Sequence, residues 1–323
     1  MPQLPALRLA RYRFTAVFER DLELPAFAGS LLRSVFGLAL RRGACMTGAP
    51  RCEPCPLYRT CAYPAIFACP PRPTQFDQQF SQVPNPYVME PPPLGTCRLP
   101  AGQALAWHQV LIGTDTLRQL PLLAHAWERA LRSGWGEQRV RGRLAQLELV
   151  DDAGRGEPVL DAGTRRLRPH EPALAWPVKI ASASFDAAHL DFETPMRLQH
   201  EGRPLRPAEL SPRKLVADLL RRCNLMLDLH LGIRPVPFDA PALVAHAAAL
   251  DDDRSALRWR EDTRWSARQR QEVPLGGVLG RWTLRGDLQP LLPWLWLGQW
   301  LHVGKNATHG LGGYRLVLEG PGR

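Results

Sequence analysis

Apolar and polar residues alternate at the start of the chain, over residues 7–18 (LRLARYRFTAVF). This two-residue period predicts a β-strand with one buried face. Over residues 30–42 apolar side chains recur every three or four positions with arginines between them, which predicts an amphipathic helix. A strand is expected again over residues 103–112, a helix over 115–133 and a strand that ends at Val150. The first half therefore has the predicted order strand, helix, strand, helix, strand.

A similar order follows a stretch rich in glycine, proline and charge, residues 151–176. It consists of a strand over about 178–192, a Thr194-Pro195 turn, a helix over 211–231 and an apolar helix over 291–301, which precedes a glycine-rich loop and a last strand. The two halves open alike and end alike. This repetition predicts an α+β protein with two tandem ferredoxin-like domains.

A length of 323 residues is sufficient for two domains that each bury a core. We expect the first domain over residues 1–150, a linker over 151–175 and the second domain over 176–323. Cysteines and prolines crowd residues 44–100, which include the run PNPYVMEPPPLG. Such a sequence is incompatible with a regular helix or a central strand, so it is expected to form an insertion in the first domain.

The chain is strongly basic, with 41 Lys plus Arg against 31 Asp plus Glu, a net charge of +10 and a pI near 9.7. This charge favours a polyanionic partner, and both nucleic acid and an anionic membrane surface satisfy it. No apolar run approaches the roughly 18–20 residues that span a bilayer, and the N-terminus lacks an apolar signal core. We therefore expect a cytoplasmic protein with no membrane partner.

Four of the seven cysteines have a spacing typical of a metal site. Cys45, Cys52, Cys55 and Cys61 form the pattern C-x6-C-x2-C-x5-C, in which the C-x2-C turn brings two thiolates to one ion. A disulfide framework is unexpected in a reducing compartment. A structural zinc ion is the preferred interpretation, an iron–sulfur cluster is an alternative, and buried inert thiols are the simplest reading without a metal.

Candidate chemistry also gathers in the segment HVGKNATHGLGGYR, residues 302–315, which contains Gly304, Gly310 and Gly312. Glycines at this density allow the backbone to approach an anion closely, while Lys305 and Arg315 supply positive charge. The segment matches neither a Walker motif nor a dinucleotide fingerprint. A tight turn between a helix and a strand explains the glycines equally well.

Arginines alternate with two tryptophans between residues 254 and 271. Guanidinium groups contact phosphate, and exposed aromatic rings stack on unpaired bases, so this segment favours single-stranded RNA. The alternative is that Trp259 and Trp265 belong to the core and the arginines to a solvated face. The candidate RNA contacts here are Arg258, Arg264 and Arg268.

The C-terminal segment HVGKNATHGLGGYRLV resembles the glycine-rich motif of the CRISPR precursor-RNA processing endoribonucleases, which belong to the RAMP superfamily. FETPMRLQHEGRPLRPAEL, LVADLLRRCNLMLDLHLG and the arginine-tryptophan segment are similar to further family segments, in the family's order. In the first half, FAGSLLRSVFGLALRR resembles the family's first helix, with Arg33, Arg41 and Arg42 as candidate RNA contacts. CMTGAPRCEPCPLYRTCAYPAIF is similar to the cysteine-bearing insertion of some members.

This resemblance implies a metal-independent endoribonuclease that cuts the precursor within its repeats, by attack of a 2'-hydroxyl on the adjacent phosphate, to leave a 2',3'-cyclic phosphate. Many family members carry a histidine near the first helix, but residues 1–107 contain none. His302, Lys305 and His309 are therefore the candidate catalytic residues. His302 and Lys305 match the family pattern, whereas His309 stands where an aromatic is more usual.

Two functions of different classes follow from the resemblance. The first is a repeat-specific endoribonuclease that matures crRNA, and the second is a noncatalytic subunit that binds crRNA in a CRISPR effector complex, with other subunits as partners. A DNA-binding regulator with a zinc module is a third possibility, which is disfavoured because no helix-turn-helix or finger pattern surrounds the cysteines.

Overall fold

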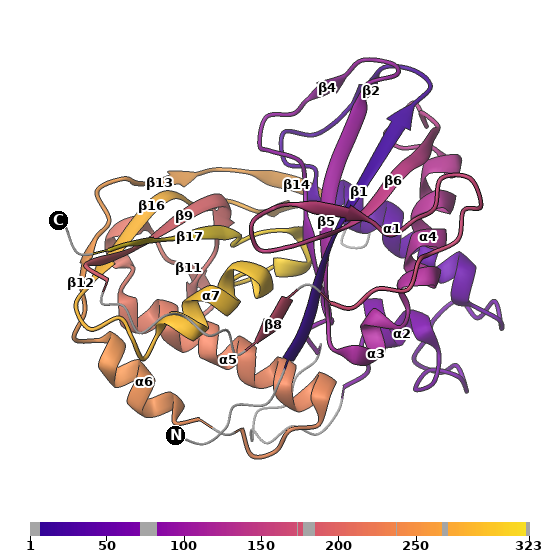
Figure 1. Cartoon of the computed structure of the whole chain (residues 1–323). Coiled ribbons are helices and arrows are strands. Elements are labelled where there is room, and N and C mark those ends of the chain that lie inside the picture. The colour runs from indigo at the N-terminus through magenta and orange to yellow at the C-terminus, as the bar shows by residue number, and fades with distance from the viewer. Residues whose placement is uncertain are drawn as a thin grey trace. The chain divides into compact units, whose positions relative to one another are not determined.

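The protein is described from a computed structural model, which covers residues 7–71, 83–172, 174–176, 185–236, 238–266 and 271–320. Its chain divides into two compact units (Figure 1). The N-terminal unit contains Ala6–Ala175 and Leu225–Pro235, and the C-terminal unit contains Trp176–Asn224 and Val236–Arg323. Each unit is described by itself below.

An antiparallel sheet with the strand order β3-β5-β1-β6-β7 forms the centre of the N-terminal unit. Its strands are β1 (Leu7–Phe18), β3 (Tyr87–Glu90), β5 (Ala104–Ile112), β6 (Gly142–Val150) and β7 (Gly156–Pro158). The helices are α1 (Gly29–Ala44), α2 (Ala62–Phe67), α3 (Thr114–Leu117) and α4 (Leu120–Ser133). The chain order β1-α1-β3-β5-α4-β6, with β1 and β5 in the middle of the sheet, is that of a ferredoxin-like fold.

The core of this unit follows from the alternation in β1, because Tyr12, Phe14, Ala16 and Phe18 are buried on one face of the sheet. Helices α1 and α4 cover this face. Phe36 of α1 stacks on Trp127 of α4, with ring centroids 5.1 Å apart. The predicted helix stripe therefore packs against the predicted strand stripe.

The C-terminal unit repeats this topology. Its main sheet has the antiparallel order β12-β16-β9-β17, and β13 also pairs with β16. These strands are β9 (Ala187–Met196), β12 (Asp251–Asp253), β13 (Leu257–Arg260), β16 (Gly277–Arg285) and β17 (Tyr314–Glu319). The long helices are α7 (Leu292–Leu301) and α5 (Pro212–Leu231), whose residues from Leu225 onward belong to the N-terminal unit. The shared strand order confirms the prediction of tandem ferredoxin-like folds.

Smaller elements complete both units. They are the strand pairs β2 (Leu22–Glu23) with β4 (Arg98–Leu99), β10 (Gln199–His200) with β11 (Arg203–Pro204) and β14 (Thr263–Ser266) with β15 (Gln271–Pro274), the strand β8 (Leu174–Trp176) and the helices η1 (Pro207–Glu209), α6 (Ala240–Ala247) and η2 (Ala307–His309). Among the described residues no helix combines the length and apolar character needed to cross a membrane.

Three sequence predictions differ from the structure. The helix expected over 115–133 is interrupted and forms α3 and α4, because Pro121 occupies the first turn of α4. Part of the expected insertion is β3, an edge strand of the main sheet, where nearby prolines disturb no second ladder. Thr194 and Pro195 form no turn, because they lie at the irregular end of β9 opposite β16.

Residues 151–175, expected as a linker, lie in the N-terminal unit and include β7. The chain passes to the C-terminal unit between Ala175 and Trp176.

The second face of the N-terminal sheet carries a row of charged and polar side chains around His108. In neighbouring strands His108 stands opposite Glu90 on one side and Arg13 on the other. Arg13 donates to Glu148 at 2.8 Å, and Arg11 lies 2.7 Å from Glu90. Burial, together with the charges of Arg11 and Arg13, lowers the pKa of His108 to about 3. The histidine is therefore neutral in the folded protein at neutral pH.

The lowered pKa of His108 predicts a loss of stability on acidification. Between pH 6.5 and about 3 the unfolded chain binds a proton that folded His108 does not, so the free energy of unfolding falls as the pH falls. From pH 7.5 to pH 5, urea unfolding should show an extra loss of up to about 2 kcal/mol in the wild type relative to His108→Gln. The exposed His200, replaced by Gln, is the control. Equal pH dependence in the wild type and His108→Gln would contradict this account.

Candidate functional site

The glycine-rich segment connects α7 to β17 and closes on itself through its backbone. Val303 N–H donates to Gly312 O at 3.0 Å, and Leu311 N–H donates to Asn306 O at 3.3 Å. The short helix η2 lies inside this closed segment, between Asn306 and Gly310, which both have left-handed backbone conformations. We call residues 302–313 the glycine loop.

The end of β9 holds the glycine loop in place. Gly312 N–H donates to Pro195 O at 3.0 Å, and Lys305 N–H donates to Arg197 O at 3.0 Å. The hydroxyl of Thr194 accepts from Gly313 N–H at 2.8 Å. The sequence marked Thr194 and Pro195 only as a turn and gave no signal for Arg197, because their role depends on a segment more than 100 residues away.

Two glycines of the loop are required by close contacts between backbone segments of the protein itself. At Gly304, φ is +86° and a Cβ would lie 2.5 Å from Arg197 O. At Gly312, φ is +74° and a Cβ would lie 1.9 Å from Val303 O. No other residue fits such positions without strain. These glycines are therefore required to build the loop.

His302 supports the loop from inside. Its side chain is buried, with 2% of the residue exposed, and its Nδ1–H donates to Leu311 O at 3.1 Å. Its ring lies so close to Gly313 that a Cβ there would be 2.7 Å from Cε1. A substrate would reach this ring only if the loop opened.

Lys305 and His309 are the more accessible of the three candidate catalytic residues. Lys305 is exposed, and no carboxylate of the described residues forms an ion pair with it. His309 is half-buried at the end of η2, four residues further along the loop. The loop therefore presents an uncompensated positive charge on a backbone that is fixed at both ends.

Two of the predicted arginine contacts lie on the C-terminal sheet. Arg315 of β17 lies 3.6 Å from Asp191, which also binds Arg281 at 2.6 Å, so one carboxylate serves two guanidinium groups. The hydrogen bonds that the Arg281 guanidinium donates to Asp191 hold the pKa of this carboxyl below its usual range. Arg258 of β13 is exposed and has no ion pair within the described residues.

Trp259, one of the two tryptophans predicted to stack on bases, already contacts other side chains of the protein. The Arg206 guanidinium lies 3.8 Å over the ring of Trp259, whose indole N–H donates to Glu261 at 2.7 Å. One face of Trp259 is thus already covered by a cation, which the sequence did not predict. The side chains of Arg264 and Trp265 and the whole of Arg268 lie outside the described residues.

Helix α1 places its three candidate arginines in different environments. Arg41 donates to Ala49 O at 2.6 Å and to Pro50 O at 2.7 Å, so it fastens the loop that follows the helix. Arg42 is exposed. The guanidinium of Arg33 lies 4.2 Å over the ring of Phe67 in α2.

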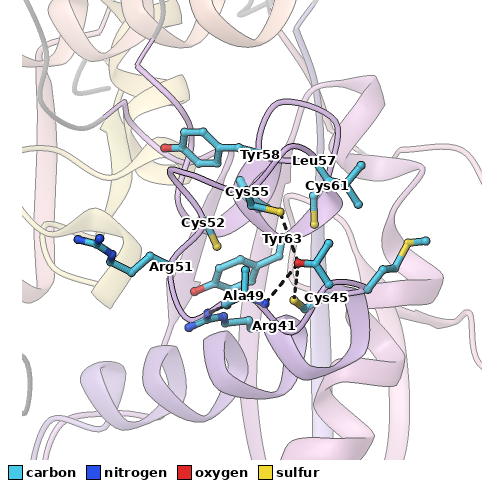
Figure 2. A pocket seen from close by; sticks show the side chains of 13 residues that line it. Arg41, Cys45, Ala49, Arg51, Cys52, Cys55, Leu57, Tyr58, Cys61 and Tyr63 are labelled. Atoms are coloured by element: carbon cyan, nitrogen blue, oxygen red, sulfur yellow. Dashed lines mark hydrogen bonds between the residues drawn. The ribbon is translucent and has the colours of Figure 1, made fainter.

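The four candidate metal ligands line one small cavity of about 20 Å³, next to α1. Figure 2 shows Cys45, Cys52, Cys55 and Cys61 gathered around it, and all four are free thiols. The Thr47 hydroxyl lies 3.9 Å from Cys45 Sγ and 3.4 Å from Cys55 Sγ. In the part of the chain that the structure describes, no three ligating side chains stand close enough to hold a metal ion as they are.

Two family models match the chain. That of the CRISPR-associated endoribonuclease Cas6 matches residues 190–314, and that of the AF_1859_N N-terminal domain matches residues 7–172. No curated protein matches the sequence.

Three solved structures share the fold at 16–17% sequence identity. A protein of a partial Cas6-RT-Cas1–Cas2 complex has a TM-score of 0.60; it is 16% identical, and the match covers 99% of this chain and 47% of that one. The chain thus spans about half the length of that protein. Cas6 of Thermus thermophilus has a TM-score of 0.53 at 17% identity, with 97% of this chain and 100% of that one covered. Cas6 in a product complex has a TM-score of 0.55 at 16% identity, with 96% and 100% covered.

The close contact at Gly312 predicts that adding one methyl group at this position lowers the stability of the protein. Gly312→Ala should lower the free energy of unfolding by about 2 kcal/mol or more, because the residue combines a left-handed conformation with a backbone oxygen 1.9 Å from the new Cβ. Gly320→Ala is the control, since nothing lies within 4 Å of its Cβ. Urea unfolding of both variants tests this, and equal stability would contradict the described loop.

Proposed function

Because the chain belongs to the Cas6 and RAMP family of CRISPR-associated proteins, we propose that it binds precursor crRNA and cleaves it within the repeat. The observation that carries this proposal is Lys305, an exposed cation without an ion-pair partner in the described residues, on a loop fixed to the end of β9. A cation in a fixed position can stabilise charge that develops on a phosphate during reaction.

Arginines that lack a carboxylate partner support RNA as the substrate. Arg33, Arg42 and Arg258 form no ion pair with the described residues, and Arg315 shares one carboxylate with Arg281. Guanidinium groups bind phosphate in a bidentate manner, and the chain carries a net charge of +10. The backbone amides of Lys305, Gly310 and Gly312 donate to acceptors within the protein, so we assign the phosphate contacts to side chains.

The proposed reaction needs no metal ion. A general base removes the proton of a 2'-hydroxyl, the oxygen attacks the adjacent phosphate, and the 5'-oxygen leaves with a proton. The products are a 2',3'-cyclic phosphate and a 5'-hydroxyl. In this scheme Lys305 stabilises the charge of the transition state, and His309 is the candidate base because His302 is buried and bonded to Leu311.

A noncatalytic crRNA-binding subunit is the second candidate function. It is favoured by the absence of histidine from residues 1–107 and by the burial of His302. Similarity to a protein of a Cas6-RT-Cas1–Cas2 complex adds other CRISPR proteins as proposed partners in either case. We propose a cytoplasmic location because the precursor RNA is made there.

A cleavage assay in EDTA separates the two functions. Incubated with a repeat RNA and excess EDTA, the enzyme should release a fragment that ends in a 2',3'-cyclic phosphate, detected by mass spectrometry. A single 2'-deoxy substitution at the cut site should abolish cleavage, because it removes the nucleophile, and should preserve binding. Tight binding of the unmodified RNA without cleavage would establish the noncatalytic function instead.

Replacement of Lys305 tests the residue that carries the proposal. Lys305→Ala should lower the single-turnover rate roughly 10²- to 10³-fold, the usual effect of losing one transition-state contact. Lys305→Arg should retain part of the rate because it keeps the charge. The matched control is Lys214→Ala, since Lys214 is bound to Asp218 at 2.9 Å on α5. A wild-type rate in Lys305→Ala would remove Lys305 from the mechanism.

A further inference from the structure

A continuous series of aromatic contacts leads from the cysteine cavity to Arg33. Tyr63 lines the cavity and stacks on Phe67, with ring centroids 5.5 Å apart and planes at 22°. Phe67 in turn lies under the Arg33 guanidinium at 4.2 Å and stacks on Tyr87, with ring centroids 6.2 Å apart. The position of the Arg33 guanidinium therefore depends on the position of Phe67 in α2.

Arg33 has no protein anion to neutralise it. Its Nε is buried without a hydrogen-bond partner, and no carboxylate of the described residues forms an ion pair with it. The cation is stabilised by aromatic rings, which attract positive charge through their faces but accept no directed hydrogen bond. A phosphate group can bind the outer nitrogens of this guanidinium with two parallel hydrogen bonds.

Helix α2 approaches α1 closely at Gly37. A Cβ on Gly37 would lie 2.1 Å from the Phe67 ring, so the ring occupies the space that a side chain would fill. Helix α2 has only six residues and is too short to be stable alone. Ile66 anchors the helix in the core of the unit, and the segment that precedes the helix determines how its first turn is held.

That preceding segment, residues 45–61, has no core of its own, because none of its residues is buried. It is shaped by a few polar contacts: Arg41 binds Ala49 O and Pro50 O, and Cys55 N–H donates to Cys52 O at 3.0 Å. A small segment without a hydrophobic core usually needs a cross-link or a metal ion for a fixed structure. The four cysteines lie where such a link would join both ends of the segment.

We propose that Cys45, Cys52, Cys55 and Cys61 bind one zinc ion, which fixes α2 so that Phe67 presents Arg33 to an RNA phosphate. Four thiolates form a closed structural site for zinc, and the four thiol protons pass to solvent on binding. Small side-chain rotations must draw the sulfur atoms together, since they do not yet stand at ligating separation. The small cavity, about 20 Å³, favours one ion over an iron–sulfur cluster. The role of Arg33 rests on the proposed function, whereas the metal site does not.

Metal analysis of the full-length protein tests the site independently of RNA. Purified under reducing conditions, the wild type should contain one zinc per chain by mass spectrometry of the metal. Cys52→Ser should lose it, whereas Cys97→Ser should retain it, because Cys97 is exposed and lies outside the cavity. Should Cys52→Ser fail to fold, zinc-stripped wild type titrated with cobalt should show the visible absorption of tetrahedral cobalt thiolate. Absence of zinc, or iron with cluster absorption, would overturn the site.

RNA affinity tests the role of Arg33. With a repeat RNA made uncleavable by one 2'-deoxy residue, Arg33→Ala should weaken binding roughly tenfold, the effect of one charge-assisted contact. Cys52→Ser should weaken binding to a similar extent, and the double variant no further, because both changes remove the same contact. Additive losses, or unchanged affinity in Cys52→Ser, would refute the positioning role. Zinc binding without RNA binding in the wild type would refute the proposed function and leave the metal site standing.

Discussion

The close approach of backbone to backbone at Gly304 and Gly312 is the constraint on which the C-terminal site depends. Each glycine stands where a Cβ would collide with a carbonyl oxygen, of Arg197 in one case and of Val303 in the other. These contacts, with the hydrogen bonds to the end of β9, leave the loop little freedom. A catalytic cation is effective only when its position is fixed before the substrate arrives, because ordering it later would consume binding free energy. The rigidity of the loop therefore matters more for Lys305 than any contact that the glycines themselves could make.

The same physical requirement is met differently in the N-terminal unit. There the candidate cation, Arg33, is held by the face of Phe67, and Phe67 is held by a helix of six residues. Ile66 anchors this helix in the core, but the segment before it buries none of its residues 45–61. One unit thus orders its cation by close packing of the backbone, whereas the other depends on side-chain stacking and, in our proposal, on a metal cross-link.

The sequence predicted most of the fold because the decisive signals are local. The alternation in β1 and the apolar stripe of α1 depend on neighbouring residues, and the repeated order of elements predicted the tandem fold. The predictions were wrong where the local structure depends on a residue far away in the sequence. The strand β3 forms between prolines because it pairs with the edge of β5. The Thr194-Pro195 segment binds a loop more than 100 residues away. For the same reason, composition predicted a polyanionic partner but could not distinguish Arg41, which fastens a loop, from Arg33, which has no ion pair in the described part of the chain.

Charge stabilisation and general base catalysis contribute separately to a reaction of the proposed kind. The chain offers a clearer candidate for the stabilising cation than for the base. A fixed cation contributes roughly 10²- to 10³-fold and a positioned base roughly 10²- to 10⁴-fold to the rate. The cation is present as Lys305. In our proposal the base is His309, which is half-buried, because His302 is buried and already donates to Leu311. A chain that keeps the cation and positions its base poorly would cut RNA slowly and hold it tightly. In our proposal, slow cleavage and stable crRNA binding are two results of one arrangement of residues, and the rate of the chemical step decides which of them dominates.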